Sequence, residues 1–296
     1  MNVGEYHVNT GEPEHRIAVI GGGVMGANIA ALAIGHGIPV VLVEVDDAAL
    51  TRAKDAVRQK LRHAQLMGAL PPGRQPGEFT QSLSVTMAAA GATAVIEAVT
   101  ELRKTKEQVL TEVSAAVRPG TLLISNTSCI PIDELAESVV RRDELVGVHF
   151  MNPAYLIKMV EVIRGTHTSD ATMAAVQALL TALGRQSLVV HDSPGFVINR
   201  LLHPLINIAA RVVDEGVASV EVVDGLVEGC LGHSTGPLRT ADLIGLDNLV
   251  DSLKVLYART GEESCRPCEG LLEKVRAGHL GRKSGQGFYD YGKVAS

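Results

Sequence analysis

Side chains capable of acid–base chemistry follow the apolar stretches of this sequence. Ser128 and Asn152 lie just after two such stretches, and His149 closes the second of them. Glu161 lies inside a further apolar run, where a carboxylate is costly to bury without a partner. A carboxylate beside an imidazole favours the protonated form and so raises the basicity of the ring. A base of this kind takes the hydroxyl proton when an alcohol is oxidised by hydride transfer. A second interpretation is a core histidine with satisfied hydrogen bonds and a glutamate paired with an Arg or Lys.

A glycine-rich turn predicts a dinucleotide site. Its residues are Gly21, Gly22, Gly23, Val24, Met25 and Gly26. A β-branched apolar run precedes the turn and helix-forming residues follow it, as a pyrophosphate-binding turn requires. Glu44 closes the next apolar run, 18 residues after Gly26, where an acid binds the ribose 2′-hydroxyl of NAD and repels the phosphate of NADP. The pattern favours NAD, against the alternative of a glycine turn beside an exposed acid.

Strand-like and helix-like segments alternate through the first part of the chain and would position these residues. We expect strands at residues 16–20, 40–44, 94–98, 121–125 and 145–149, with continuations at 159–163 and 186–190. Helices are expected at residues 27–36, 47–67, 105–117 and 132–140, and the Pro- and Gly-rich residues 70–77 form a break. Strands spaced by helices indicate an α/β, Rossmann-type, mostly parallel sheet, whose ligands lie beyond the carboxyl ends of the strands.

The pattern changes near Ser193. The segments 196–215, 219–230 and 246–260 have a period of 3.6 residues, which predicts an all-α helical domain. We therefore expect an N-terminal extension (residues 1–14), an NAD-binding Rossmann-type domain (15–192) and a helical C-terminal domain (193–296). The apolar stripes of the helical domain exceed what one cleft needs, which favours a homodimer.

Composition and charge argue against several classes of protein. The 296 residues are 46 % hydrophobic, which argues against global disorder. A net charge of −6 disfavours binding to nucleic acid or to an anionic membrane. The polar start lacks the apolar core of a signal peptide, and no apolar run reaches the roughly 18 residues that span a bilayer. We expect a soluble, cytoplasmic protein without a metal site.

The four cysteines are too few for a disulfide scaffold in a chain of this length. Cys265 and Cys268 have the spacing of a redox pair, but they lie far from the start of any βαβ unit. We expect them to be reduced thiols without a catalytic role.

Several segments together resemble one enzyme family. They are residues 18–26, 96–101, 125–128, 148–153, 160–163, 192–201 and 280–289. The sequence is similar to the short, single-function 3-hydroxyacyl-CoA dehydrogenases, and among them to bacterial 3-hydroxybutyryl-CoA dehydrogenases. The resemblance runs from residue 16 nearly to residue 291 and is weakest between residues 61 and 92. It implies NAD-dependent interconversion of a 3-hydroxyacyl thioester and its 3-ketoacyl form, in a cleft between two domains, by a homodimer.

The resemblance also implies a role for particular residues. His149 is implied as the catalytic base and Glu161 as the partner that orients it. Ser128 and Asn199 are implied to hydrogen-bond the substrate oxygen at the reacting carbon. The implied contacts to the cofactor are Glu101, Lys106 and Asn152 at the nicotinamide half, and Lys283 in the tail. Alternative interpretations are a helix cap for Asn199, a solvated surface for Lys106 and a turn charge for Lys283.

The helix at residues 47–67 departs from the family pattern. Lys60 and Met67 stand where the family often has a serine and a lysine that contact CoA, and residues 70–77 shorten the helical hairpin usual there. Basic residues near Lys60, namely Arg58 and Arg62, either face an acidic acyl carrier protein or form a solvated surface. Tyr155 is bulkier than the residue expected near the acyl chain, and its ring would select a short or polar acyl group.

Three hypotheses follow for the function. The first is an NAD-dependent dehydrogenase of short-chain acyl-CoA thioesters. The second is a biosynthetic relative that acts on a hydroxyacyl group held by an acyl carrier protein. The third, from another class, is a non-catalytic NAD-binding structural protein, which the presence of Ser128, His149, Glu161 and Asn199 disfavours.

Overall fold

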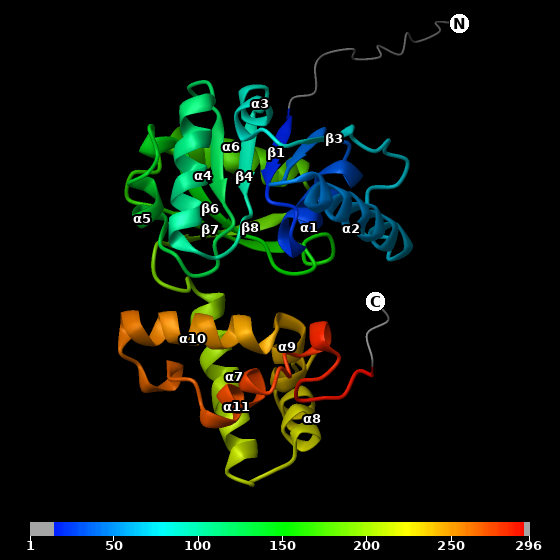
Figure 1. Cartoon of the computed structure of the whole chain (residues 1–296), viewed down its shortest axis with the longest axis vertical. Coiled ribbons are helices and arrows are strands. Elements are labelled where there is room, and N and C mark those ends of the chain that lie inside the picture. Colours follow the sequence, from blue (N-terminus) through cyan, green and yellow to red (C-terminus); the bar gives the residue numbers. More distant parts are fainter. Residues whose placement is uncertain (1–14, 293–296) are drawn as a thin grey trace, which may run out of the picture. The chain divides into compact units, whose positions relative to one another are not determined.

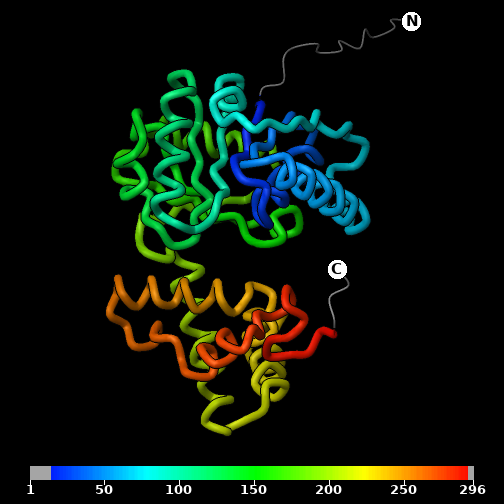
Figure 2. The backbone as a smooth tube through the Cα atoms, viewed as in Figure 1, coloured from blue at the N-terminus to red at the C-terminus, as the bar shows by residue number. Residues whose placement is uncertain are grey.

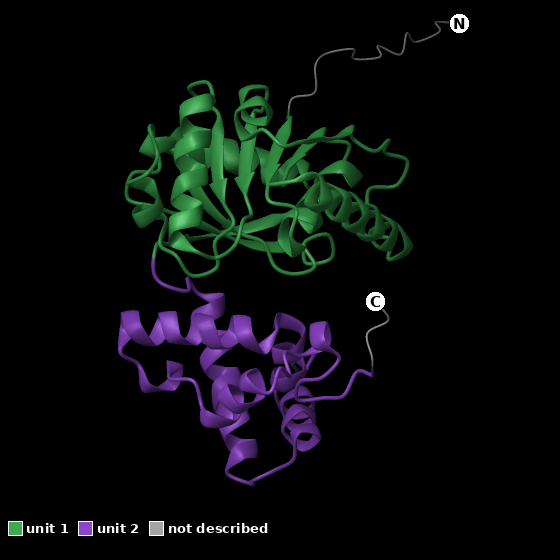
Figure 3. Ribbon diagram, viewed as in Figure 1, with its two compact units in different colours: residues 1–192 green, residues 193–296 purple. Residues whose placement is uncertain are grey.

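The computed structural model describes residues 15–292, so the predicted extension at residues 1–14 lies outside the described part. The chain divides after Asp192 into two compact units (Figure 3). The first unit contains the sheet, and the second unit is built from helices.

An eight-stranded sheet forms the centre of the first unit. Its order is β3-β2-β1-β4-β5-β6-β7-β8, and every neighbouring pair is parallel except β6 and β7. The strands are β1 (Ile17–Ile20), β2 (Val40–Val43), β3 (Phe79–Ser82), β4 (Ala94–Glu97), β5 (Leu122–Ser125), β6 (Leu145–His149), β7 (Met159–Arg164) and β8 (Gln186–His191). Figure 2 shows the chain running outward from β1 to β3 and returning to β4 on the other side of β1. This doubly wound order confirms the predicted fold class of this unit.

Helices cover both faces of the sheet (Figure 1). They are α1 (Val24–Gly35), α2 (Asp47–Leu66), α3 (Val85–Ala90), α4 (Arg103–Ala116), α5 (Ile132–Ala136) and α6 (Asp170–Ala182). Helices α1, α2 and α6 share one apolar core with the strands, and α3, α4 and α5 lie over the other face. The predicted helices are present, within a few residues at each end.

Helix α1 illustrates why these residues form this layer. All its residues from Gly26 to Gly35 are buried, because the helix packs between the sheet and α2 and is apolar all round. Burying side chains such as Ile29 and Leu32 stabilises the fold by about 1.5–3 kcal/mol each. Helix α2 has one polar face, and its N-cap Asp46 accepts a hydrogen bond from the Ala49 amide at 2.6 Å.

The sequence analysis missed three elements of the first unit: β3, α3 and α6. Strand β3 reads Phe-Thr-Gln-Ser and lies half-exposed at one edge of the sheet. Such a strand lacks the alternation of apolar and polar residues that predicts a half-buried strand. Its pairing with β2, from Val40 opposite Phe79 to Val43 opposite Ser82, is a long-range contact that local patterns do not contain.

The second unit is all-α, as predicted. Its helices are α7 (Ile198–Asp214), α8 (Val220–Leu231), α9 (Pro237–Ile244), α10 (Leu246–Thr260) and α11 (Glu269–Arg276). Their apolar faces enclose a core that includes Ile206, Leu249 and Leu253. The sequence analysis did not single out α9 and α11, which are short, with eight residues each.

The four cysteines are free thiols, and Cys129, Cys265 and Cys268 are buried. Burial raises the pKa of the Cys268 thiol to about 11, so this residue stays protonated at neutral pH. Among the helices of residues 15–292, none combines the length and apolar character needed to cross a bilayer.

Candidate active site

The glycine turn between β1 and α1 has the geometry of a phosphate-binding loop. Gly21 has φ +96°, and a Cβ there would lie 2.8 Å from the carbonyl oxygen of Ala98. A Cβ on Gly26 would lie 1.8 Å from the carbonyl oxygen of Gly21, so only glycine allows this close packing. A Cβ on Gly23, the N-cap of α1, would meet no atom within 4 Å. The space above this helix N-terminus therefore fits a pyrophosphate group.

Glu44 lies beside the same turn, directly after β2. Its Oε1 accepts a hydrogen bond from the Gly22 amide at 2.6 Å, and its Oε2 accepts one from the Val45 amide at 3.1 Å. A carboxylate has about four lone-pair sites, so Glu44 retains the capacity to accept ribose hydroxyls. A cavity of about 450 Å³ opens here, and its wall includes Glu44, Arg52 and Lys60. This acceptor and the space beside it fit the adenosine half of NAD.

The position of Lys60 contradicts one expectation about the surface of α2. The sequence analysis grouped it with Arg58 and Arg62 on one basic surface. In the structure Lys60 is half-buried and lines the cavity beside Glu44, whereas the two arginines are exposed. Burial lowers the pKa of Lys60. The three cations therefore do not share one solvated surface.

Glu101 lies just before α4 and accepts hydrogen bonds from the loop after β5. Its Oε1 accepts three hydrogen bonds, from Thr127 Oγ1 at 2.5 Å and from the amides of Ser128 and Cys129 at 2.8 and 3.0 Å. Lys106 Nζ lies 3.2 Å from its Oε2. Burial raises the pKa of Glu101, but Lys106 and these donors outweigh that effect and lower the pKa below its usual value. Glu101 is therefore a stable carboxylate beside Ser128.

Lys106 also contacts a second carboxylate, Glu97, at the end of β4. Its Nζ donates to Glu97 Oε1 at 2.8 Å and to the carbonyl oxygen of Val99 at 3.3 Å. The Lys106 side chain is only 1 % exposed, so its interpretation as a solvated surface charge is wrong. In this geometry Lys106 fixes Glu101.

His149 and Glu161 lie opposite each other on adjacent strands. Strands β6 and β7 are antiparallel, and their register pairs these two residues directly. His149 Nδ1 lies 2.8 Å from Glu161 Oε2, and both side chains are buried. Side chains opposite each other in an antiparallel pair are close neighbours, which explains how residues on two strands meet.

Asn152 follows β6 and is exposed. Its Oδ1 accepts a hydrogen bond at 3.3 Å from Nδ2 of Asn28, a fully buried residue of α1. Asn126, after β5, accepts a hydrogen bond from the Phe150 amide at 3.1 Å and thereby joins the ends of β5 and β6. The carboxyl ends of β1, β4, β5 and β6 thus contribute to one polar edge of the sheet.

The second unit carries the two remaining site residues that the sequence predicts. Asn199 is buried in the first turn of α7, and the N-cap of that helix is Val197 rather than Asn199. Lys283 lies in a 3₁₀ turn (Arg282–Ser284), and its Nζ is 2.6 Å from the carboxylate of Asp247. Both Asn199 and Lys283 belong to the second of the two compact units.

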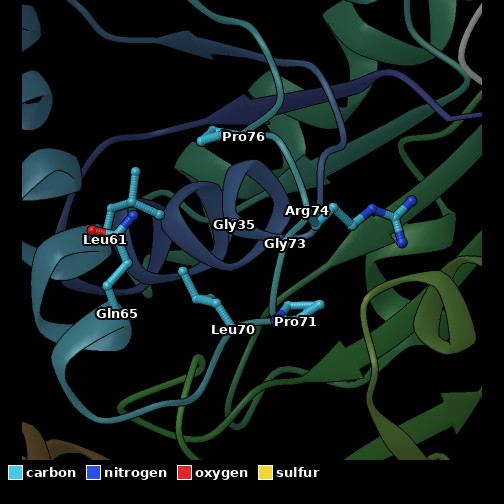
Figure 4. Close-up of a pocket in the computed structure, with 8 residues that line it drawn as sticks. All are labelled: Gly35, Leu61, Gln65, Leu70, Pro71, Gly73, Arg74 and Pro76. Carbon is cyan, nitrogen blue, oxygen red and sulfur yellow. The ribbon is translucent and has the colours of Figure 1, made fainter.

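Another cavity lies at the opposite end of α1 (Figure 4). It measures about 230 Å³, and its wall includes Gly35, Leu61, Leu70 and Arg74. In Figure 4 the guanidinium group of Arg74 extends away from the other side chains. The 12 residues of α1 separate this cavity from the glycine turn by about 18 Å. It is therefore not part of the nucleotide site.

The sequence analysis expected Tyr155 near the acyl chain of the substrate. It is 6 % exposed and belongs to the core that α1, α2 and α6 share with the sheet. Its hydroxyl lies 3.0 Å from Nδ1 of His63 on α2. Burial raises the pKa of this hydroxyl. The ring fixes the loop after β6 against α2, so the structure does not support its proposed role in selecting the acyl group.

Comparisons with known proteins identify the family. The model of the 3-hydroxyacyl-CoA dehydrogenase NAD-binding domain matches residues 16–193, and that of the C-terminal domain of the same enzymes matches residues 195–291. The chain belongs to the 3-hydroxyacyl-CoA dehydrogenase family. A probable 3-hydroxybutyryl-CoA dehydrogenase of Deinococcus radiodurans is 39 % identical, over 93 % of this chain and 100 % of the relative.

Solved structures agree with this assignment. The (S)-3-hydroxybutyryl-CoA dehydrogenase PaaH1 of Ralstonia eutropha has a TM-score of 0.84 at 37 % identity, covering 94 % of this chain and 99 % of that one. FadB2 of M. tuberculosis has a TM-score of 0.88 at 34 % identity, with the same coverage of each chain. These similarities confirm the predicted family, NAD as cofactor and an oxidoreductase of the 3-hydroxyacyl-CoA dehydrogenase type, and they set aside the non-catalytic hypothesis.

The sequence analysis missed Glu97, Thr127 and Asn28, three residues that contact predicted site residues. Glu97 carried a usable signal, because it is a carboxylate in the apolar run 94–98, the same signal that singled out Glu161. Thr127 and Asn28 carried no such signal, because a threonine in a loop and an asparagine in a helix are common in proteins. Their roles depend on long-range contacts with Glu101 and Asn152.

Proposed function

We propose that this chain interconverts short-chain 3-hydroxyacyl-CoA and 3-ketoacyl-CoA, with His149 as the catalytic base and Glu161 as its partner. The observation that carries the proposal is the 2.8 Å contact between His149 Nδ1 and Glu161 Oε2 at the carboxyl end of β6. Ligands of open α/β sheets lie at that edge. Relatives of this chain named 3-hydroxybutyryl-CoA dehydrogenases support a short acyl group.

The pair explains how a proton leaves the substrate. When Nδ1 carries the proton and donates a hydrogen bond to Glu161, the tautomer of His149 is fixed and Nε2 becomes the atom that accepts the hydroxyl proton. The Glu161 carboxylate then stabilises the imidazolium that forms. Burial of both side chains strengthens this interaction, because it lies away from bulk water. When NAD is bound, its nicotinamide accepts the hydride from the carbon that carries the substrate hydroxyl.

The residues of the first unit would hold NAD along the polar edge of the sheet. The glycine turn would bind the pyrophosphate, and Glu44 would accept hydrogen bonds from the adenosine ribose and disfavour a 2′-phosphate. Glu101 and Asn152 would hold the nicotinamide half, with Lys106 acting on it through Glu101. From the second unit, Lys283 would contact the cofactor.

Ser128 and Asn199 would hydrogen-bond the substrate oxygen at the reacting carbon. The family favours CoA as the carrier of the acyl group. An acyl carrier protein is the second candidate, because Lys60 and Met67 stand where the family pattern has CoA contacts. Two exposed cations on α2, Arg58 and Arg62, favour that candidate through attraction to an acidic carrier.

The carrier is tested by following NADH consumption with acetoacetyl-CoA and with the same acetoacetyl group on a carrier protein. We expect turnover with the CoA thioester to exceed turnover with the carrier-protein thioester. Replacing NADH by NADPH should reduce kcat/KM, because Glu44 repels the added phosphate. Faster turnover of the carrier-protein thioester would establish the second candidate, and no turnover of either thioester would refute the proposed reaction.

A further inference from the structure

Glu97 is a buried carboxylate that the proposed reaction does not use. It ends β4 and is 1 % exposed. Its Oε1 accepts hydrogen bonds from Lys106 Nζ and from the Val99 amide, both at 2.8 Å. Its Oε2 accepts one from Ser125 Oγ at 2.6 Å, across the pair that β4 and β5 form. Hydrogen bonds from this many donors hold the Glu97 carboxylate in a fixed position.

Three charges lie in contact at this place. Lys106 bridges Glu97 and Glu101, with Nζ–O distances of 2.8 and 3.2 Å. Two carboxylates and one ammonium give the cluster a net charge of −1. Without the Glu97 charge, Lys106 and Glu101 would neutralise each other. Glu97 therefore determines whether this cluster is negative or neutral.

The cluster faces the edge where the cofactor reacts. Glu97 and Ser125 close β4 and β5, and the Glu101 side chain, 39 % exposed, is the surface of the cluster. The nicotinamide ring carries a positive charge in NAD⁺ and none in NADH. A fixed charge beside that ring therefore acts on one redox state of the cofactor more than on the other.

We propose that Glu97 is a positioning residue that makes the nicotinamide subsite negative and so favours NAD⁺ over NADH. This inference rests on the part of the proposed function that places the nicotinamide half beside Glu101. It goes beyond a structural role, in which Glu97 would only satisfy the buried ammonium of Lys106 and would affect both forms of the cofactor equally.

The experiment compares the dissociation constants of NAD⁺ and NADH, from calorimetry and from NADH fluorescence. For Glu97→Gln, the ratio of Kd for NAD⁺ to Kd for NADH should rise on the order of tenfold, the effect of one charge across roughly 10 Å at an effective dielectric constant of about 20. ADP-ribose, which lacks the nicotinamide, should bind with unchanged affinity.

Two further variants separate charge from structure. The double variant Glu97→Gln with Lys106→Met restores a net charge of −1, so its ratio should return toward the wild-type value. Ser125→Ala removes one hydrogen bond to Glu97 at constant charge and should leave the ratio unchanged. An unchanged ratio in Glu97→Gln, or equal shifts in the single and double variants, would overturn the proposal.

The result is separable from the proposed reaction, because it measures binding and needs no acyl substrate. If the ratio follows the charge while acetoacetyl-CoA is not reduced, the inference stands and the proposed reaction fails. If acetoacetyl-CoA is reduced and the ratio does not follow the charge, the proposed reaction stands and the inference fails.

Discussion

At the scale of the residue, the site depends on carboxylates that are buried together with a partner. Glu161 is paired with His149, and Glu97 with Lys106. Removing one member of such a pair leaves a buried polar group or charge without compensation, which is costly. Substitutions that keep shape and hydrogen bonding therefore test chemistry better than truncation to alanine does.

His149→Gln should lower kcat by roughly 10²-fold or more, because glutamine cannot accept and release the proton. The affinity for NAD should stay nearly unchanged, since His149 is proposed to act on the substrate. Steady-state kinetics and calorimetry measure the two quantities. His233→Gln, at an exposed position of the second unit, is the matched control. Unaltered turnover in His149→Gln would remove this residue from the chemistry.

At the scale of the element, buried carboxylates attach the C-terminal segment to the helices of the second unit. Asp242 of α9 accepts hydrogen bonds from the amides of Phe288 and Tyr289, both at 2.9 Å, and from the Tyr291 hydroxyl at 3.1 Å. A Cβ on Gly287 would lie 2.0 Å from Asp242 Oδ1. The glycine is therefore required where the segment passes over the carboxylate, and this attachment holds the segment that carries Lys283.

Asp242→Ala should destabilise the protein by about 2–4 kcal/mol, because three donors lose their buried acceptor. Urea unfolding followed by circular dichroism measures the change. Asp251→Ala on α10 is the matched control: Asp251 is exposed, its ion pair with Lys254 is 3.6 Å long, and its loss should change stability by less than about 0.5 kcal/mol. Equal stability of the Asp242 variant and wild type would show that the attachment contributes nothing.

At the scale of the whole molecule, the second unit exposes apolar side chains that its own core does not use. Val222 and Leu226 of α8 are 50 % and 56 % exposed, and they share one face of that helix because they are four residues apart. Leu201 and Ile208 of α7 are 67 % and 47 % exposed. Several exposed apolar side chains on two helices favour association of two copies. We propose a homodimer through this unit. The cytoplasmic location stays a prediction.

Sedimentation velocity at micromolar concentration should show a dimer. Leu226→Asp should shift the equilibrium toward the monomer, since the charge would lose its hydration in an apolar interface. Leu102→Asp, at a position of the first unit that is 64 % exposed, should leave the dimer intact. A wild-type chain that sediments only as a monomer would exclude this interface.

The sequence by itself determined most of the elements and the cofactor turn. Alternating strands and helices, the glycines from Gly21 to Gly26 and the acid at Glu44 depend on neighbours within a few residues, so local patterns contain them. Only the tertiary structure decided which side chains meet. The antiparallel register of β6 and β7 places His149 against Glu161, and the packing of α4 buries Lys106 between two carboxylates. Such contacts join residues on different elements, and burial follows from packing that no short segment encodes.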